Sequence, residues 1–142
     1  MRALLQKLLL LLALSAMPAM AADWVLVANP QSGLKALSHD EVVNIYLGRY
    51  RYLASGLTAE PIDQAMDAPI RAHFYRHLVD KSVGEINAYW SRLTFSGKTR
   101  PPRVVHNSEQ ALQLVARTPG ALAYVERSKV DARVMVVFQL PE

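Results

Sequence analysis

Residues 60–78 read EPIDQAMDAPIRAHFYRHL, and this stretch predicts a short strand that runs into a helix. The strand is expected at 60–63, where Pro61 either places it at a sheet edge or is its first residue. Asp67 is expected to cap the helix, with Pro69 in its first turn. The helix then has an apolar residue at every fourth position, which predicts one buried face, formed by Ile70, Phe74 and Leu78.

Strands and helices alternate along the rest of the chain. Apolar runs rich in β-branched residues predict further strands at 24–28, 104–105, 121–125 and 134–138. Two capping boxes predict helix starts, one formed by Ser38 and Glu41 and the other by Ser82 and Glu85. Ser108 is expected to cap a further short helix. This alternation predicts an α/β fold with a largely parallel sheet flanked by helices.

The apolar phase of each expected element predicts the core. Large side chains on that phase should be buried because they face the neighbouring layer. These residues are Trp24, Tyr46, Phe74, Trp90, Leu112, Tyr124 and Val136.

The composition describes one globular domain. The chain has 142 residues, of which 51% are hydrophobic and 20% are charged, which excludes a disordered protein. It has no cysteine, so disulfides and cysteine-ligated metals are excluded. The formal net charge is +4, and this modest excess does not indicate nucleic-acid binding.

The first 21 residues have the layout of a signal peptide. Arg2 and Lys7 supply the basic start, residues 8–14 are apolar, and Ala19 and Ala21 are small residues at a cleavage site. The apolar run is shorter than the roughly 20 residues that a membrane span needs. We therefore expect cleavage after residue 21 and a domain at 22–142 without a membrane anchor, located in the periplasm.

Three separated motifs resemble a known family in their order and spacing. They are Leu37-Ser38-x-Asp40-Glu41-x-x-x-Ile45-Tyr46-Leu47-Gly48, then Pro61-Ile62-Asp63-Gln64 leading to Ala68-Pro69-Ile70-Arg71-x-x-Phe74, and Pro119-Gly120-Ala121-Leu122-Ala123-Tyr124-Val125. Over nearly all of 24–139, the set is similar to the second lobe of the substrate-binding proteins of phosphate ABC transporters. The resemblance implies one lobe of a periplasmic-binding-protein-like fold.

The sequence departs from this family at the expected anion site. In the family, an upstream arginine and a Ser-Gly-Thr helix start contact the phosphate. Here Gln64 stands at the arginine position, and Ala68, Pro69 and Ile70 replace the serine, glycine and threonine. Only Arg71 matches the family motif. The resemblance therefore implies a degenerate anion site with weak or no phosphate binding by the isolated protein.

Five residues are the candidates for contact with a small oxyanion. A helix start favours anions because its backbone N–H groups are free. Arg71 and Asp67 at this helix start, together with Gln64, are therefore candidates for contact with the anion. Lys98 and Arg100 lie in a basic loop and are the remaining candidates. We expect no catalytic residue, no cofactor and no metal site, and therefore not an enzyme.

Two functions remain open. The first is an exported substrate-binding-protein-like domain that acts with a transporter and has this degenerate anion site. The alternative is a periplasmic protein-interaction or sensory accessory module that docks on another periplasmic protein or a membrane receptor. Its expected contact is the segment 49–51 with Tyr50 and Tyr52, because tyrosine and arginine dominate interface energetics.

Overall fold

The computed structural model describes residues 23–140. The predicted signal peptide at 1–21 lies outside the described residues. Among those that are described, no helix is long and apolar enough to cross a membrane.

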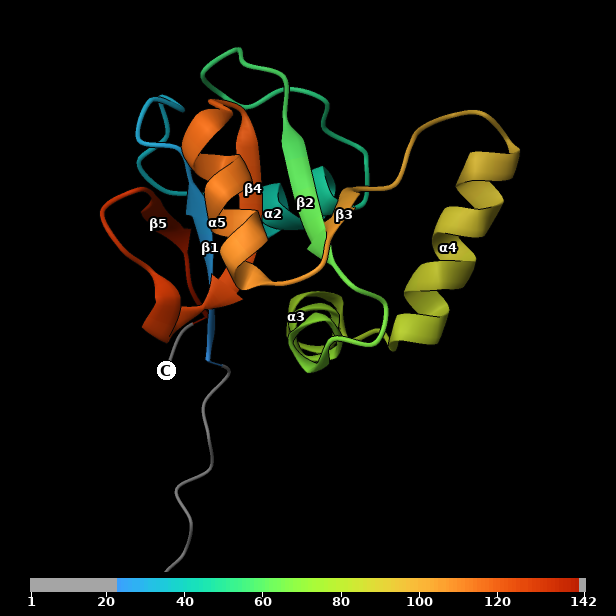
Figure 1. Ribbon diagram of the computed structural model, residues 1–142. Coiled ribbons are helices and arrows are strands. Elements are labelled where there is room, and N and C mark those ends of the chain that lie inside the picture. The colour runs from blue at the N-terminus through green and yellow to red at the C-terminus, as the bar shows by residue number, and fades with distance from the viewer. Residues whose placement is uncertain (1–22, 141–142) are drawn as a thin grey trace, which may run out of the picture.

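The helices and strands alternate as the sequence predicts, and Figure 1 shows their arrangement. The strands are β1 (Trp24–Ala28), β2 (Glu60–Gln64), β3 (Arg103–Val105), β4 (Ala121–Glu126) and β5 (Met135–Phe138). The helices are α2 (His39–Tyr46), α3 (Pro69–Val79), α4 (Val83–Phe95) and α5 (Ser108–Arg117), with a short 3-10 turn, η1, at Arg127–Lys129.

The five strands form one sheet in the order β3-β2-β4-β1-β5. β2 pairs in parallel with β3 and β4, whereas β1 pairs antiparallel with β4 and β5. Four strands therefore share one direction and β1 alone is reversed, which confirms an α/β fold with a largely parallel sheet. The edge position allowed for the strand of Pro61 is wrong, because β2 is an inner strand. Pro61 lies near its start, one residue before the pairing with β3 begins.

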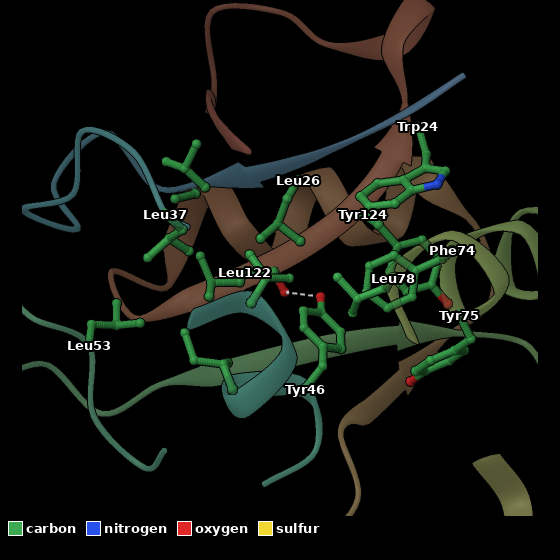
Figure 2. Close-up of a cluster of buried hydrophobic side chains, with 14 of the residues drawn as sticks. Trp24, Leu26, Leu37, Tyr46, Leu53, Phe74, Tyr75, Leu78, Leu122 and Tyr124 are labelled. Atoms are coloured by element: carbon green, nitrogen blue, oxygen red, sulfur yellow. Dashed lines mark hydrogen bonds between the residues drawn. The ribbon is translucent and has the colours of Figure 1, made fainter. Parts of the chain in front are cut away.

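Helices cover both faces of the sheet. Alternate residues of β1 point to opposite faces, and each set joins a different apolar cluster. Leu26 packs with α2 and α3 in the larger cluster, shown in Figure 2, where the hydroxyl of Tyr46 donates to the carbonyl of Leu122 at 3.2 Å. Val25 and Val27 face α5 in the smaller cluster.

Six of the seven predicted core residues are buried, and one is not. Val136 is 39% exposed, so its predicted burial is wrong. β5 is an edge strand, and its register against β1 shifts between Leu26 and Val27. Val137 is the buried residue of β5 instead.

The helix starts confirm two of the four predicted caps. Ser38 and Ser82 each accept a backbone N–H and are bonded in return by a glutamate, so both capping boxes form. Asp67 does not cap α3. The N-cap is Ala68, because Pro69 takes the first helical position, where its missing N–H is not needed. Ser108 is also not a cap, since Asn107 precedes it and accepts the N–H of Gln110.

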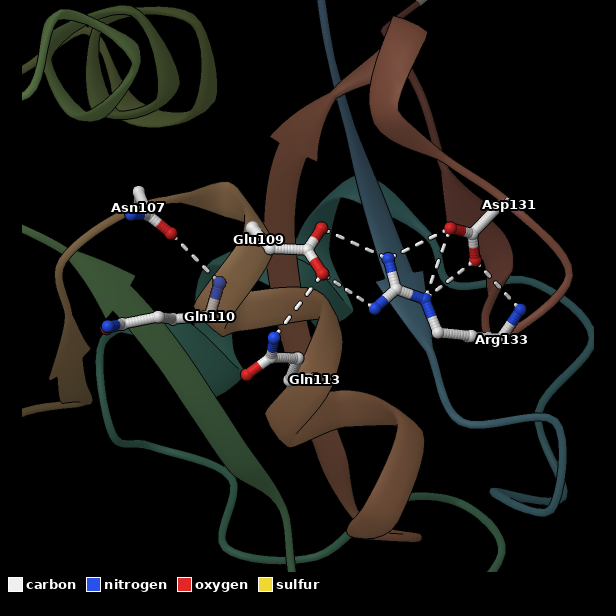
Figure 3. Close-up of polar contacts among 6 residues, drawn as sticks. All are labelled: Asn107, Glu109, Gln110, Gln113, Asp131 and Arg133. Carbon is white, nitrogen blue, oxygen red and sulfur yellow. Dashed lines mark hydrogen bonds and ion pairs between the residues drawn. The ribbon is translucent and has the colours of Figure 1, made fainter.

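An exposed ion-pair network connects α5 to the turn before β5, as Figure 3 shows. Arg133 donates to Glu109 at 2.8 Å and to Asp131 at 2.9 Å. All three side chains are at least one-third exposed, so solvent screens these pairs.

Candidate functional site

A buried carboxylate, Asp63, lies near the carboxyl end of β2. Arg71 Nε lies 3.2 Å from both of its oxygens, and the hydroxyl of Tyr75 donates to Oδ2 at 2.8 Å. The hydroxyl of Tyr124 also donates to Oδ1. The side chains of Asp63 and Arg71 are each only 4% exposed. This set of four residues is called the Asp63 cluster below.

The local chain path explains why these groups meet. β2 ends and α3 begins within a few residues, so the first turn of α3 faces the end of the strand. Arg71 and Tyr75 are four residues apart and therefore lie on the same helical face. Tyr124 comes from β4, which pairs in parallel with β2. β2 and α3 thus supply the ion pair, and α3 and β4 supply the tyrosines that donate hydrogen bonds to Asp63.

The tyrosines of the cluster are held in their neutral form. Burial raises the pKa of Tyr75 and of Tyr124 well above the usual tyrosine value, and the negative charge of Asp63 raises both further. Each phenol therefore keeps its proton and donates a hydrogen bond to Asp63. A buried carboxylate needs such partners, because an unpaired charge in the interior is very costly.

Arg71 has one guanidinium nitrogen without a partner in the described part of the chain. Its Nη2 donates to Asn87 on α4 at 3.0 Å, and its guanidinium lies 5.2 Å from the ring centre of Tyr75. Nη1 is buried and has no hydrogen-bond partner among the described residues. The hydrogen bonds of the guanidinium group are therefore made to Asp63 and Asn87, within the protein.

Gln64 follows Asp63 and is likewise buried. Its side-chain nitrogen donates to the hydroxyl of Ser108 at 2.9 Å and to the carbonyl of Tyr124 at 3.0 Å. Ser108 in turn donates to Glu126. The side-chain amide of Gln64 thus donates to α5 and to β4 and links the helix to the sheet.

Lys98 and Arg100 lie elsewhere, in a groove of about 650 Å³ that Tyr50, Arg51 and Tyr52 also line. We call it the basic groove. A guanidinium nitrogen of Arg51 donates to the carbonyl of Lys98 at 3.3 Å. None of the described residues that line the groove is acidic. Its cations are all exposed, in contrast to Arg71.

The structure therefore places four of the five predicted anion contacts at two separate sites. Gln64 and Arg71 are in or beside the Asp63 cluster, and Lys98 and Arg100 are in the basic groove. Asp67 is exposed in the turn between β2 and α3 and belongs to neither. The sequence analysis missed the role of Asp63. The available signal was a carboxylate next to Ile62 in a strand expected to pack in the sheet, because a buried carboxylate needs a cation or hydrogen-bond donors.

The two histidines of α3 lie on one exposed side of the helix. His73 and His77 are exposed, with ring centres 6.1 Å apart. Among residues 23–140 no group of three or more potential metal ligands occurs.

Comparisons with known proteins find relatives by structure and not by sequence. No protein-family model matches the chain, and no curated protein matches it. An ABC-type phosphate transport receptor from Vibrio cholerae superposes over 81% of this chain with a TM-score of 0.65 and 14% identity. A Clostridium perfringens protein, described as a phosphate ABC transporter substrate-binding protein with bound phosphate, also superposes over 81%, with a TM-score of 0.65 and 16% identity. PstS from Borrelia burgdorferi matches over 72% with a TM-score of 0.52 and 11% identity.

The matches extend over less than half of each of these proteins. This chain covers 45%, 44% and 40% of their lengths, respectively. The identity is low enough that the similarity shows the fold and no more. The chain has the α/β fold of a single lobe of the phosphate substrate-binding proteins that it resembles.

Proposed function

We propose that this chain is an exported, non-enzymatic binding module of the substrate-binding-protein type whose anion site is degenerate. It binds phosphate weakly or not at all on its own. The observation that carries this proposal is the burial of Arg71 against Asp63. The one residue that matches the family's binding motif is committed to an internal carboxylate.

The helix start also lacks the donors that an oxyanion needs. Ala68 and Ile70 have no hydroxyl, and Pro69 has no backbone N–H. A site with several charge-assisted bonds binds in the micromolar range, at about −8 kcal/mol. The loss of two or three such bonds, at about 1.5–3 kcal/mol each, leaves a dissociation constant in the millimolar range or weaker.

Calorimetry on residues 22–142 with phosphate and with sulfate tests the proposal. We expect a dissociation constant in the millimolar range or no measurable heat. A value below about 10 μM contradicts the proposal. In that case Lys98→Gln with Arg100→Gln tests the basic groove, and Lys35→Gln with Arg117→Gln is the control that removes the same charge elsewhere.

Export is part of the same proposal and has its own test. The basic start, apolar run and small residues of 1–21 support cleavage after Ala21. When the full chain is expressed in a Gram-negative host, the mass of the periplasmic product should correspond to 22–142. Recovery of the intact chain in the membrane fraction contradicts export with cleavage.

A second candidate function is a module that docks on another periplasmic protein or a membrane receptor. It is supported by Tyr50 and Tyr52, which are 49% and 65% exposed and line the basic groove. Exposed tyrosine beside arginine is typical of residues that dominate interface energetics. Tyr50→Ala and Tyr52→Ala should leave folding unchanged and weaken retention of such a partner.

A further inference from the structure

A second groove separates β3 from α4. It has a volume of about 540 Å³, and its lining includes Asp63 and Arg71 together with Trp90 and Phe95 of α4 and Val104 of β3. Figure 1 shows α4 standing beyond β3, outside the edge of the sheet. We call this the β3–α4 groove. It adjoins the basic groove, because Trp90 lines both.

Two buried donors without partners belong to residues that line the β3–α4 groove. They are Nη1 of Arg71 and Nε1 of Trp90, and no other buried side-chain nitrogen or oxygen among the described residues lacks a partner. A buried donor left unsatisfied costs about 1–3 kcal/mol, and more where the group is charged. Both donors belong to residues that line the groove, so acceptor atoms of a bound segment would satisfy them.

The groove also exposes apolar side chains and the free edge of a strand. Phe95 is 97% exposed, Met66 60% and Val104 55%, and all three line it. β3 is the last strand on its side of the sheet, and no other described strand pairs with its outer edge. An unpaired strand edge is a template for an added strand. The apolar side chains provide contacts for alternate residues of that strand.

Charge defines the occupant further. Residues 86–108 supply most of the groove's lining and contain no Asp or Glu. Arg92, Arg100 and Arg103 do not line the groove but are sequence neighbours of lining residues, and Lys98 and Arg100 line the adjoining basic groove. Asp63 is the one acidic lining residue, and its oxygens already accept bonds from Arg71, Tyr75 and Tyr124. Carboxylates on an occupant would therefore lie near cations at the groove's border and meet no free carboxylate among the described lining residues.

We propose that the β3–α4 groove binds an extended segment of a partner protein in which apolar residues alternate with acidic ones. The segment pairs with β3 and places acceptor oxygens at Nη1 of Arg71 and Nε1 of Trp90. This inference rests on the second candidate function, since it names the partner chemistry of the docking role. It adds a contact at the adjoining edge of the sheet to the one expected at Tyr50 and Tyr52.

The test uses residues 22–142 and a short fluorescently labelled peptide of alternating glutamate and valine. Fluorescence anisotropy should show binding that weakens as salt rises, and a peptide with glutamine in place of glutamate should bind less tightly. In ¹H–¹⁵N spectra the indole N–H resonance of Trp90 should shift on binding. The Trp24→Phe variant assigns the two indole signals, and the signal of Trp24, which donates to His77, should stay in place.

Two matched variants locate the site. Val104 and Val136 are exposed valines on the opposite edge strands β3 and β5. Val104→Glu should weaken peptide binding by about tenfold or more, because it places a carboxylate beside the acidic segment. Val136→Glu adds the same charge at the other edge and should leave the affinity unchanged.

Several results would overturn the inference. These are no peptide binding, equal weakening by both variants, or a shift of the Trp24 signal alone. A dimer that sedimentation detects and Val104→Glu dissociates would assign the groove to a second copy of this chain. Micromolar phosphate binding would contradict the proposed function and leave the peptide result standing, so the two failures can be told apart.

Discussion

The Asp63 cluster and the basic groove both contain cations that suit an anion, but they differ in what those cations already bind. Arg71 is buried and paired with Asp63, whereas Arg51, Lys98 and Arg100 are exposed around a groove without an acidic residue. The difference shows that a residue type at a motif position does not establish a binding role. The charge of Arg71 is paired inside the fold, while the cations of the basic groove are exposed to solvent.

Breaking the buried pair should have the largest effect. Asp63→Asn leaves the Arg71 cation without a carboxylate in the interior, and we expect a loss of about 3–5 kcal/mol in the free energy of unfolding. Denaturant titration of 22–142 measures this loss. Asp131→Asn is the control, because it breaks an exposed pair with Arg133 and should leave the midpoint unchanged. Equal effects of the two variants would show that burial of the Asp63 pair has no consequence.

Phe74→Ala tests the apolar support of the same cluster. The Phe74 ring stacks on Tyr124 with ring centres 4.0 Å apart and meets Tyr75 edge-on at 4.9 Å. The side chain is fully buried, so its truncation should cost about 3–5 kcal/mol. A loss below about 1 kcal/mol in denaturant titration would contradict this burial.

Tyr124→Phe removes a single hydroxyl from the cluster. A hydrogen bond to a charged group contributes about 1.5–3 kcal/mol, and we expect a loss in that range. Tyr52→Phe removes a hydroxyl from an exposed ring in the basic groove and should cause no measurable loss. Thermal unfolding measures the melting temperatures of both variants for this comparison. Equal melting temperatures would mean that the bond from Tyr124 to Asp63 adds nothing to stability.

The buried tyrosines also predict how stability depends on pH. Burial raises the pKa of Tyr46, Tyr75 and Tyr124 above the usual value, so the folded state keeps protons that the unfolded chain releases near pH 10. Their contribution is complete below pH 10 and declines above it, by about 1.4 kcal/mol per pH unit for each tyrosine. Urea titrations between pH 9 and 11 should show this decline, and Tyr124→Phe should make it shallower. A pH-independent midpoint in this range would contradict it.

Neutralising the basic groove should have the smallest effect on stability. Lys98→Gln with Arg100→Gln removes two exposed charges, and we expect the free energy of unfolding to change by less than about 0.5 kcal/mol. Chemical denaturation of the double variant measures the change. A loss comparable to that of Asp63→Asn would mean that these cations are also part of the fold.

The sequence predicts local features of this fold well. The capping boxes at Ser38 and Ser82 form as expected, because each depends on residues only three apart. The prediction fails at Asp67, where several residues near a helix start compete for one role and the fixed φ of Pro69 decides the outcome. It fails at Val136 because burial in an edge strand depends on the register with β1, which no local pattern contains.

The candidate site is less predictable than the fold, for a related reason. Asp63 and Arg71 are eight residues apart, and their contact requires the turn between β2 and α3 to bring a strand end against a helix face. Tyr124 arrives from a strand much later in the chain. Family resemblance points to Arg71 but does not reveal its partner. Only the assembled sheet shows that the cation is already neutralised.

The reversed strand β1 has a consequence for when the protein can fold. β1 lies between β4 and β5, so the earliest described strand takes its place only after the two latest strands are present. Contacts between such distant parts of a chain form slowly, because the long intervening loop must close first. A chain of this topology cannot complete its core while its last residues are still being synthesised.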